Sequence, residues 1–173
     1  MKKTFKLSMF FLLFATVFVS CEKNEKKEWS VFLNYGVSDI VGEYSHSNAS
    51  DAFSDLMESD EGHLCPDAKV SIVSKSEETI SFSLVCPDHN FQKSFSGKPS
   101  LNTNDFLIDM YSNMSNLKRY GVTAKVMKNA QNDIRLNGFV TEDRYKRFYD
   151  TEAQIYDTVY DYSVKYYFDV IKN

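Results

Sequence analysis

Two cysteines and two histidines form the densest group of side chains able to do chemistry. His63 closely precedes Cys65, and His89 closely follows Cys86. Thiolates and imidazoles of this kind can hold zinc tetrahedrally. The same cysteines could instead form a disulfide, because the alternating pattern between them predicts a hairpin that brings their Cα atoms toward the required ~4.4–6.8 Å. We expect the Cys65–Cys86 disulfide, worth roughly 3 kcal/mol, and no bound metal or cofactor.

The third cysteine closes an amino-terminal leader. Three lysines stand among the first six residues, and an apolar run of 13 residues, 7–19, is too short to span a bilayer. The run ends in Phe18-Val19-Ser20-Cys21, which resembles the lipobox of bacterial lipoproteins, although Phe18 stands where an aliphatic residue is usual. The resemblance implies a signal peptide over 1–20 and acylation of Cys21, for example by palmitate. Several acyl chains make such an anchor effectively permanent. An ordinary secretory signal is the alternative.

The next residues, 21–28, place the anchor on a charged tether. Every residue from 22 to 28 is charged or amidic, so this stretch has nothing to bury. With the tyrosine-rich body, it resembles the small lipoproteins of Bacteroidetes, in which such residues can direct export to the cell surface. The resemblance implies an outer-membrane lipoprotein that faces either the periplasm or the exterior. Residues 29–173 have the length of a single domain.

The charge balance limits the partners. Loss of the leader would leave 17 basic and 24 acidic residues, a net charge of −7. Phosphate binding needs clustered cations, so the sequence argues against nucleic acid as a partner. Contact with the membrane is expected through the lipid anchor alone.

Alternating apolar residues predict a mainly β body. Clear hairpins are expected from Val70–Ile72 with Ile80–Cys86, and from Tyr120–Val126 with Ile134–Val140. Further strands are expected near residues 40–45, 91–95 and 106–110, and a short helix after Ser50. Residues 141–156 favour a helix or irregular loop over a strand. A long strand over 158–171 would bury Tyr160, Tyr162, Tyr166 and Phe168 and leave Tyr167 exposed.

About eight strands joined by short turns predict an antiparallel meander, closed as a barrel or packed as a two-sheet sandwich, with one or two short helices. Gly42-Glu43-Tyr44 near the first clear strand is similar to the Gly-x-Trp motif of lipocalins. That resemblance implies a calycin-like barrel whose interior could take a small apolar ligand.

The remaining motifs favour a protein that is not an enzyme. The chain has three histidines and none of the common nucleophile, zincin or phosphate-loop motifs. We expect a binding protein for a small apolar ligand or an envelope protein. A surface glycan-binding protein or glycan hydrolase is the alternative, because tyrosines alternate with aspartates near the C-terminus. Asp157-Thr158-Val159 is similar to the O-glycosylation signal of Bacteroidetes, and its use would require an exposed Thr158.

Overall fold

The protein is mainly β in the computed structural model, which describes residues 28–32, 35–46, 62–102 and 107–173. The expected helix after Ser50 and the whole leader lie outside these residues. Within them, the two helices are α1 (Val37–Ile40) and the 3₁₀ helix η1 (Pro87–His89). The strands are β1 (Ser30–Val31), β2 (Gly42–His46), β3 (Gly62–Leu64), β4 (Lys69–Ser74), β5 (Ile80–Cys86), β6 (Phe91–Gly97), β7 (Ser100–Asn102), β8 (Leu107–Tyr111), β9 (Lys118–Lys128), β10 (Ile134–Asp150) and β11 (Ile155–Lys172).

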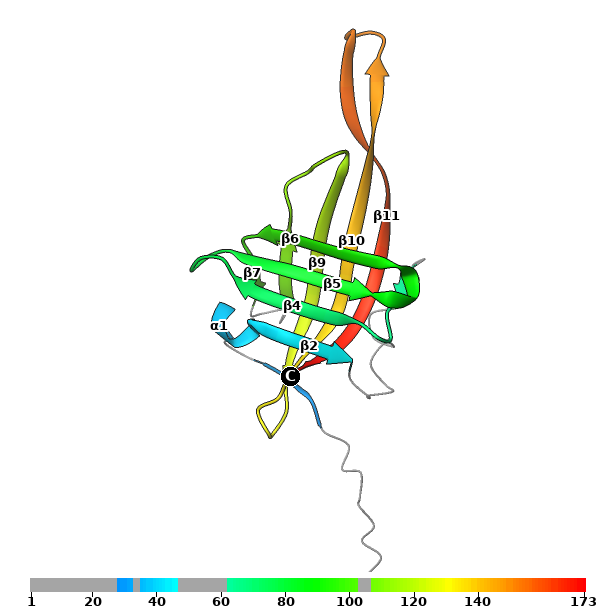
Figure 1. Ribbon diagram of the computed structural model, residues 1–173. Helices are drawn as coiled ribbons and strands as arrows, with labels where there is room; N and C mark the ends of the chain where they lie inside the picture. The colour runs from blue at the N-terminus through cyan, green and yellow to red at the C-terminus, as the bar shows by residue number, and fades with distance from the viewer. Residues whose placement is uncertain (1–27, 33–34, 47–61, 103–106) are drawn as a thin grey trace, which may run out of the picture.

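The described strands form one folded-over sheet in the order β6-β5-β4-β2-β11-β10-β9-β8-β7, with β1 on β9 and β3 on β11. All pairs are antiparallel except β3 with β11. The layer of β2, β4, β5 and β6 crosses the layer of β8 to β11 at a steep angle (Figure 1). This is the geometry of a sandwich or open barrel, as the alternating pattern predicted.

The space between the two layers is filled by apolar side chains. Residues one apart on a strand point to opposite faces, so each strand sends alternate residues inward. β5 shows this most regularly, with every second residue buried from Ile80 to Cys86. The largest fully buried side chains are Tyr44, Phe82, Phe168, Ile40, Ile72, Ile80, Leu84, Ile108, Met110, Leu136, Val70 and Val122. The core is therefore packed with side chains from both layers.

Both predicted hairpins are confirmed. β4 pairs with β5 from Lys69↔Val85 to Ser74↔Ile80, and β9 pairs with β10 from Lys128↔Ile134 to Lys118↔Arg144. The second hairpin places Gly138 where a side chain would collide with the backbone of Ala124 on β9. Only glycine allows the two strands this close an approach.

The expectation of a helix or loop over 141–156 is wrong. β10 continues to Asp150, the chain turns over residues 151–154, and β11 begins at Ile155. Thr141 caps no helix, because it pairs with Gly121 on one side and Lys165 on the other. The helical spacing of aromatic residues that favoured a helix arises by coincidence from two strand faces. Cross-strand pairing with the long β11 decides the conformation here.

The burial predicted for the last strand is wrong at three of its tyrosines. Tyr160 and Tyr162 are 56% and 43% exposed, although Tyr166 and Phe168 are buried as expected. β11 runs beyond the sandwich, so an alternating pattern continues where no second layer covers it. Tyr167 is buried instead of exposed, because Gly62 of β3 lies against its ring and Phe139 packs edge-on to it at 5.5 Å.

Candidate functional site

The β10–β11 hairpin projects from the sandwich as an arm, defined here as residues 145–160. β9 pairs with β10 only as far as Arg144, and β3 pairs with β11 no further out than Lys165. Beyond these points the two strands pair with each other alone, as the orange end of the ribbon in Figure 1 shows. Six of the eleven exposed large hydrophobic side chains among the described residues belong to 148–162: Phe148, Tyr149, Ile155, Tyr156, Tyr160 and Tyr162. Such a concentration of exposed apolar side chains is typical of interaction sites, so the arm is the candidate site of this protein.

A β-bulge at the base of the arm sets which side chains share a face. Arg144 pairs with Tyr162, but Tyr145 pairs with Tyr160, so Asp161 is an extra residue on β11. The bulge moves Tyr160 from the face of Tyr162 to the face of Tyr145. The backbone N–H of Tyr145 also donates to the carbonyl of Leu117 at 2.8 Å, which fixes the base of the arm to the β8–β9 turn.

One face of the arm carries two cross-strand tyrosine pairs. Tyr145 and Tyr160 meet edge-to-face with ring centroids 5.9 Å apart, and Tyr149 and Tyr156 lie 4.9 Å apart. Arg147 and Thr158 pair with each other between them. We call these six residues the tyrosine face. The two pairs are four positions apart along the strand, about 13 Å. Every side chain on this face has a hydrogen-bonding group, and four have an aromatic ring.

The opposite face of the arm differs in chemistry. Phe148, Ile155 and Val159 alternate there with Lys146, Asp150 and Asp157. Lys146 forms an ion pair with Asp161 at 2.8 Å. This face is more aliphatic than the tyrosine face, so the two faces would favour different partners.

The base of the arm holds a network around Glu142, a buried carboxylate that the sequence did not single out. Its oxygens accept hydrogen bonds from Lys118 Nζ at 3.0 Å, Arg144 Nε at 2.6 Å and the Tyr120 hydroxyl at 2.9 Å. Burial alone would raise the pKa of Glu142, but these hydrogen bonds outweigh it and leave the pKa below its ordinary value of 4.5. Burial and the bond to Glu142 raise the pKa of Tyr120 to about 12. Tyr120 therefore remains a donor at neutral pH.

The two cysteines and two histidines singled out in the sequence lie close together in the structure, and the cysteines form the predicted disulfide. Cys65 and Cys86 form a disulfide with Cα atoms 5.2 Å apart, and both are fully buried. The rings of His63 and His89 lie 4.3 Å apart, and His89 Nε2 is 2.8 Å from the carbonyl oxygen of Leu64. The sulfur atoms are bonded to each other, so they are not available here as the thiolate ligands that a zinc site would need.

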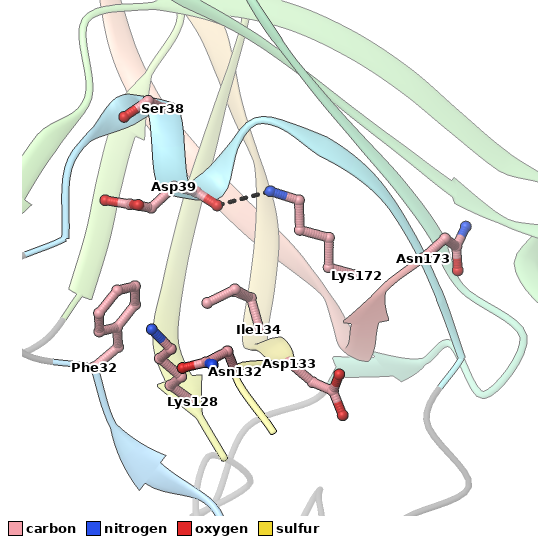
Figure 2. A pocket seen from close by; sticks show the side chains of 9 residues that line it. All are labelled: Phe32, Ser38, Asp39, Lys128, Asn132, Asp133, Ile134, Lys172 and Asn173. Carbon is pink, nitrogen blue, oxygen red and sulfur yellow. Dashed lines mark hydrogen bonds between the residues drawn. The ribbon is translucent and has the colours of Figure 1, made fainter. Parts of the chain in front are cut away.

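A cavity of about 410 Å³ lies at the opposite end of the sandwich from the arm and contains two carboxylates (Figure 2). Asp39 Oδ2 accepts from the backbone N–H of Gly36 at 2.7 Å, and Asp133 accepts from the side chain of Asn129 at 2.8 Å. Lys172 donates to the carbonyl oxygen of Asp39 at 2.9 Å. Each carboxylate thus accepts a hydrogen bond from a residue three or four positions before it in the chain. Figure 2 shows the two carboxylates on different sides of the cavity.

Thr158 is exposed on the arm, as its proposed modification would require. Cys21 lies outside the described residues, and none of the described helices is long and apolar enough to cross a membrane. Comparisons with protein-family models, curated proteins and solved structures find no match. The similarity of Gly42-Glu43-Tyr44 to the lipocalin motif remains a sequence prediction.

Proposed function

We propose that this chain is a lipid-anchored, non-enzymatic binding protein of the outer membrane, and that it holds a glycan on the tyrosine face of its arm. The exposure of that face carries the proposal: Tyr156 is 74% and Tyr149 45% exposed. Aromatic rings stack on the apolar faces of sugars, while hydroxyl and guanidinium groups bond to sugar hydroxyls. A purely apolar ligand would leave the polar groups of Arg147 and Thr158 unpaired, which is unfavourable.

The direction of the arm supports a partner distant from the anchor. Trp29 stands eight positions after Cys21 and lies against Arg135, with the guanidinium 5.5 Å from the centre of its ring. Arg135 stands near the start of β10, and Tyr149 near its end. They are fourteen positions apart, which corresponds to about 46 Å of strand. A lipid on Cys21 would therefore hold the base of the sandwich near the membrane and leave the arm facing away from it.

The packed core favours an external site over a carrier function. The inward positions of both layers are occupied by large apolar side chains, with Phe82 contacting Phe95 and Phe168 at ring distances of 5.8 and 5.9 Å. A small apolar ligand held between the layers would have to displace them. Burial of such side chains stabilises a fold by about 1.5–3 kcal/mol each, so displacement would be costly.

The test uses the two faces of the arm as controls for each other. The protein and two double variants, Tyr149→Ser with Tyr156→Ser and Phe148→Ser with Ile155→Ser, are run in native gels that contain dextran, laminarin or xylan. We expect at least one polysaccharide to retard the parent protein and the Phe148/Ile155 variant, but not the Tyr149/Tyr156 variant. No retardation of the parent, or equal loss in both variants, would refute the proposal. Loss only in the Phe148/Ile155 variant would place the glycan on the opposite face and would also refute the proposal.

The anchor is tested separately. Cells that express the parent chain or Cys21→Ser are labelled with a palmitate analogue, and the protein is then recovered and examined for label. Label in the parent alone would support the anchor, and an unlabelled parent would contradict it.

A further inference from the structure

A second cavity, of about 330 Å³, lies between β6, an edge strand of the sheet, and the β8–β9 region of the other layer. β6 forms one side, and the β8–β9 turn with the start of β9 forms the other. Gly97 allows β6 to approach β8 closely, because a side chain there would come within 2.8 Å of the carbonyl oxygen of Tyr111 on β8. The lining residues are Lys93, Ser94, Phe95, Ser96, Ser112, Asn113, Ser115, Asn116, Lys118 and Tyr120. We call it the seam cavity.

The seam cavity is cationic, although the whole chain has a net charge of −4. Its lining contains two lysines and no acidic residue. Lys118 shares the carboxylate of Glu142 with Arg144, so two cations pair with this one buried anion. Lys93 forms no ion pair with any described residue. Its Nζ lies 4.6 Å from the centre of the Tyr120 ring. The local balance is thus positive, and an anion would be attracted there.

Lys93 also points in an unusual direction. It pairs with the buried Leu84 and lies between Phe91 and Phe95 on the inward side of β6. An inward lysine on an edge strand can protect the edge from pairing with other chains. That role accounts for Lys93 alone. It does not account for Lys118 on the opposite side of the cavity, nor for the serine and asparagine side chains that line the space between them.

The turn beside the cavity is held in an unfavourable conformation. Asn116 and Leu117 both have positive φ, 51° and 59°, and Ser115 and Lys118 exchange two backbone hydrogen bonds of 2.9 Å. A branched residue such as Leu117 rarely adopts this conformation. The tight turn sets Asn116 and Lys118 at the rim of the cavity and so fixes polar groups before any ligand arrives.

We propose that the seam cavity binds the anionic group of a small polar ligand, a carboxylate, phosphate or sulfate. Lys93 and Lys118 supply the positive charge, and the surrounding hydroxyl and amide groups supply hydrogen bonds. Phe95 and Tyr120 stack at 6.1 Å and give the cavity an aromatic wall. This site lies on the sandwich and involves no residue of the tyrosine face, so it does not depend on the proposed function.

The experiment follows backbone amide signals by NMR while inorganic phosphate, sulfate, galacturonate or galactose is added to the purified protein. We expect saturable shifts at residues 93–96 and 112–120 with the anions and none with galactose. Tighter binding of galacturonate than of phosphate would identify an acidic sugar as the ligand class, and the reverse order a phosphate compound. Added salt should weaken binding, because the charges are partly exposed to solvent.

Two matched variants complete the test. Lys93→Gln should weaken anion binding about tenfold or more, the effect of losing one hydrogen bond to a charged group. Lys69→Gln makes the same charge change at an exposed position of β4 and should leave binding unchanged. No saturable shift in the parent protein, equal binding by Lys93→Gln, or equal weakening by both variants would overturn the proposal. The parent titration decides the question even if a variant folds poorly.

Discussion

Reduction of the Cys65–Cys86 disulfide should destabilise the domain by about 3 kcal/mol. The bond joins the segment before β4 to the end of β5, across 21 positions of sequence. In the chain-entropy model, opening a loop of this length restores conformational freedom to the unfolded chain, and the model gives about 3 kcal/mol near room temperature. Reduction removes the cross-link but keeps every side chain, so this value contains no cavity contribution.

The surroundings of the bond sharpen the expected result. Both cysteines are fully buried, and the backbone N–H of Cys65 donates to the carbonyl oxygen of Tyr167 on β11 at 2.9 Å. These contacts can survive reduction, so the reduced protein should still fold. Replacement by Cys65→Ala with Cys86→Ala should cost more than reduction, because it also removes two buried sulfur atoms.

The assay is urea unfolding of oxidised and reduced protein, the latter reduced in denaturant and refolded with reductant present. The double alanine variant is the control and should give the same curve with and without reductant. A difference below about 1 kcal/mol between the two forms would refute the reasoning, because the loop model would then fail for this pair. Thiol titration of the denatured protein without reductant checks the starting state and should find neither Cys65 nor Cys86 free.

Three further predictions concern β10 and β11. Phe168→Ala should cost about 3–5 kcal/mol in a fully buried site, whereas Tyr160→Ala on the exposed arm should cost about 0.5 kcal/mol or less; equal losses in urea unfolding would contradict the packing described above. Asp169→Ala should cost about 3–5 kcal/mol, because it leaves the buried guanidinium of Arg135 unpaired; a melting temperature like that of the parent would contradict this. Glu142→Gln should make the free energy of unfolding depend less on pH in acid. The lowered pKa of Glu142 stabilises the fold above the unfolded carboxyl pKa, and this stabilisation is lost as the pH falls through the folded pKa. Parallel curves of stability against pH for parent and variant below pH 4.5 would exclude that role.

Local patterns were sufficient to predict the parts of the fold that two complementary neighbours determine. The hairpins β4–β5 and β9–β10 are examples, because each has a short turn and strands with one apolar side. The pairing of Cys65 with Cys86 followed from the first of them. The crossing of the two layers could not be read in the same way, since it depends on β11 joining β2, which is distant in sequence.

The candidate site could not be predicted from the sequence, because alternating apolar residues indicate a strand but not which part of the strand another layer covers. Tyr160 and Phe168 belong to the same alternating pattern, yet only Phe168 lies under the second layer. The bulge at Asp161 also changes the face of Tyr160, and nothing in the local sequence predicted it. The lengths of the alternating segments did carry a signal. The alternating pattern of β11 is longer than that of β2, β4, β5 or β6, the strands of the layer that covers it.

The position of β11 in the sheet bears on how the domain is assembled. It is the last strand in the described chain but stands fifth of the nine in the main strand order, between β2 and β10. Until β11 is added, β2 and β4 to β6 form one layer and β7 to β10 another, with no strand to connect them. Completion of the fold must then wait for β11, whose pairing with β2 is a contact between strands distant in sequence and so is expected to form slowly. The two layers of a newly made chain would accordingly stay unconnected until β11 has been synthesised and has paired with both β2 and β10.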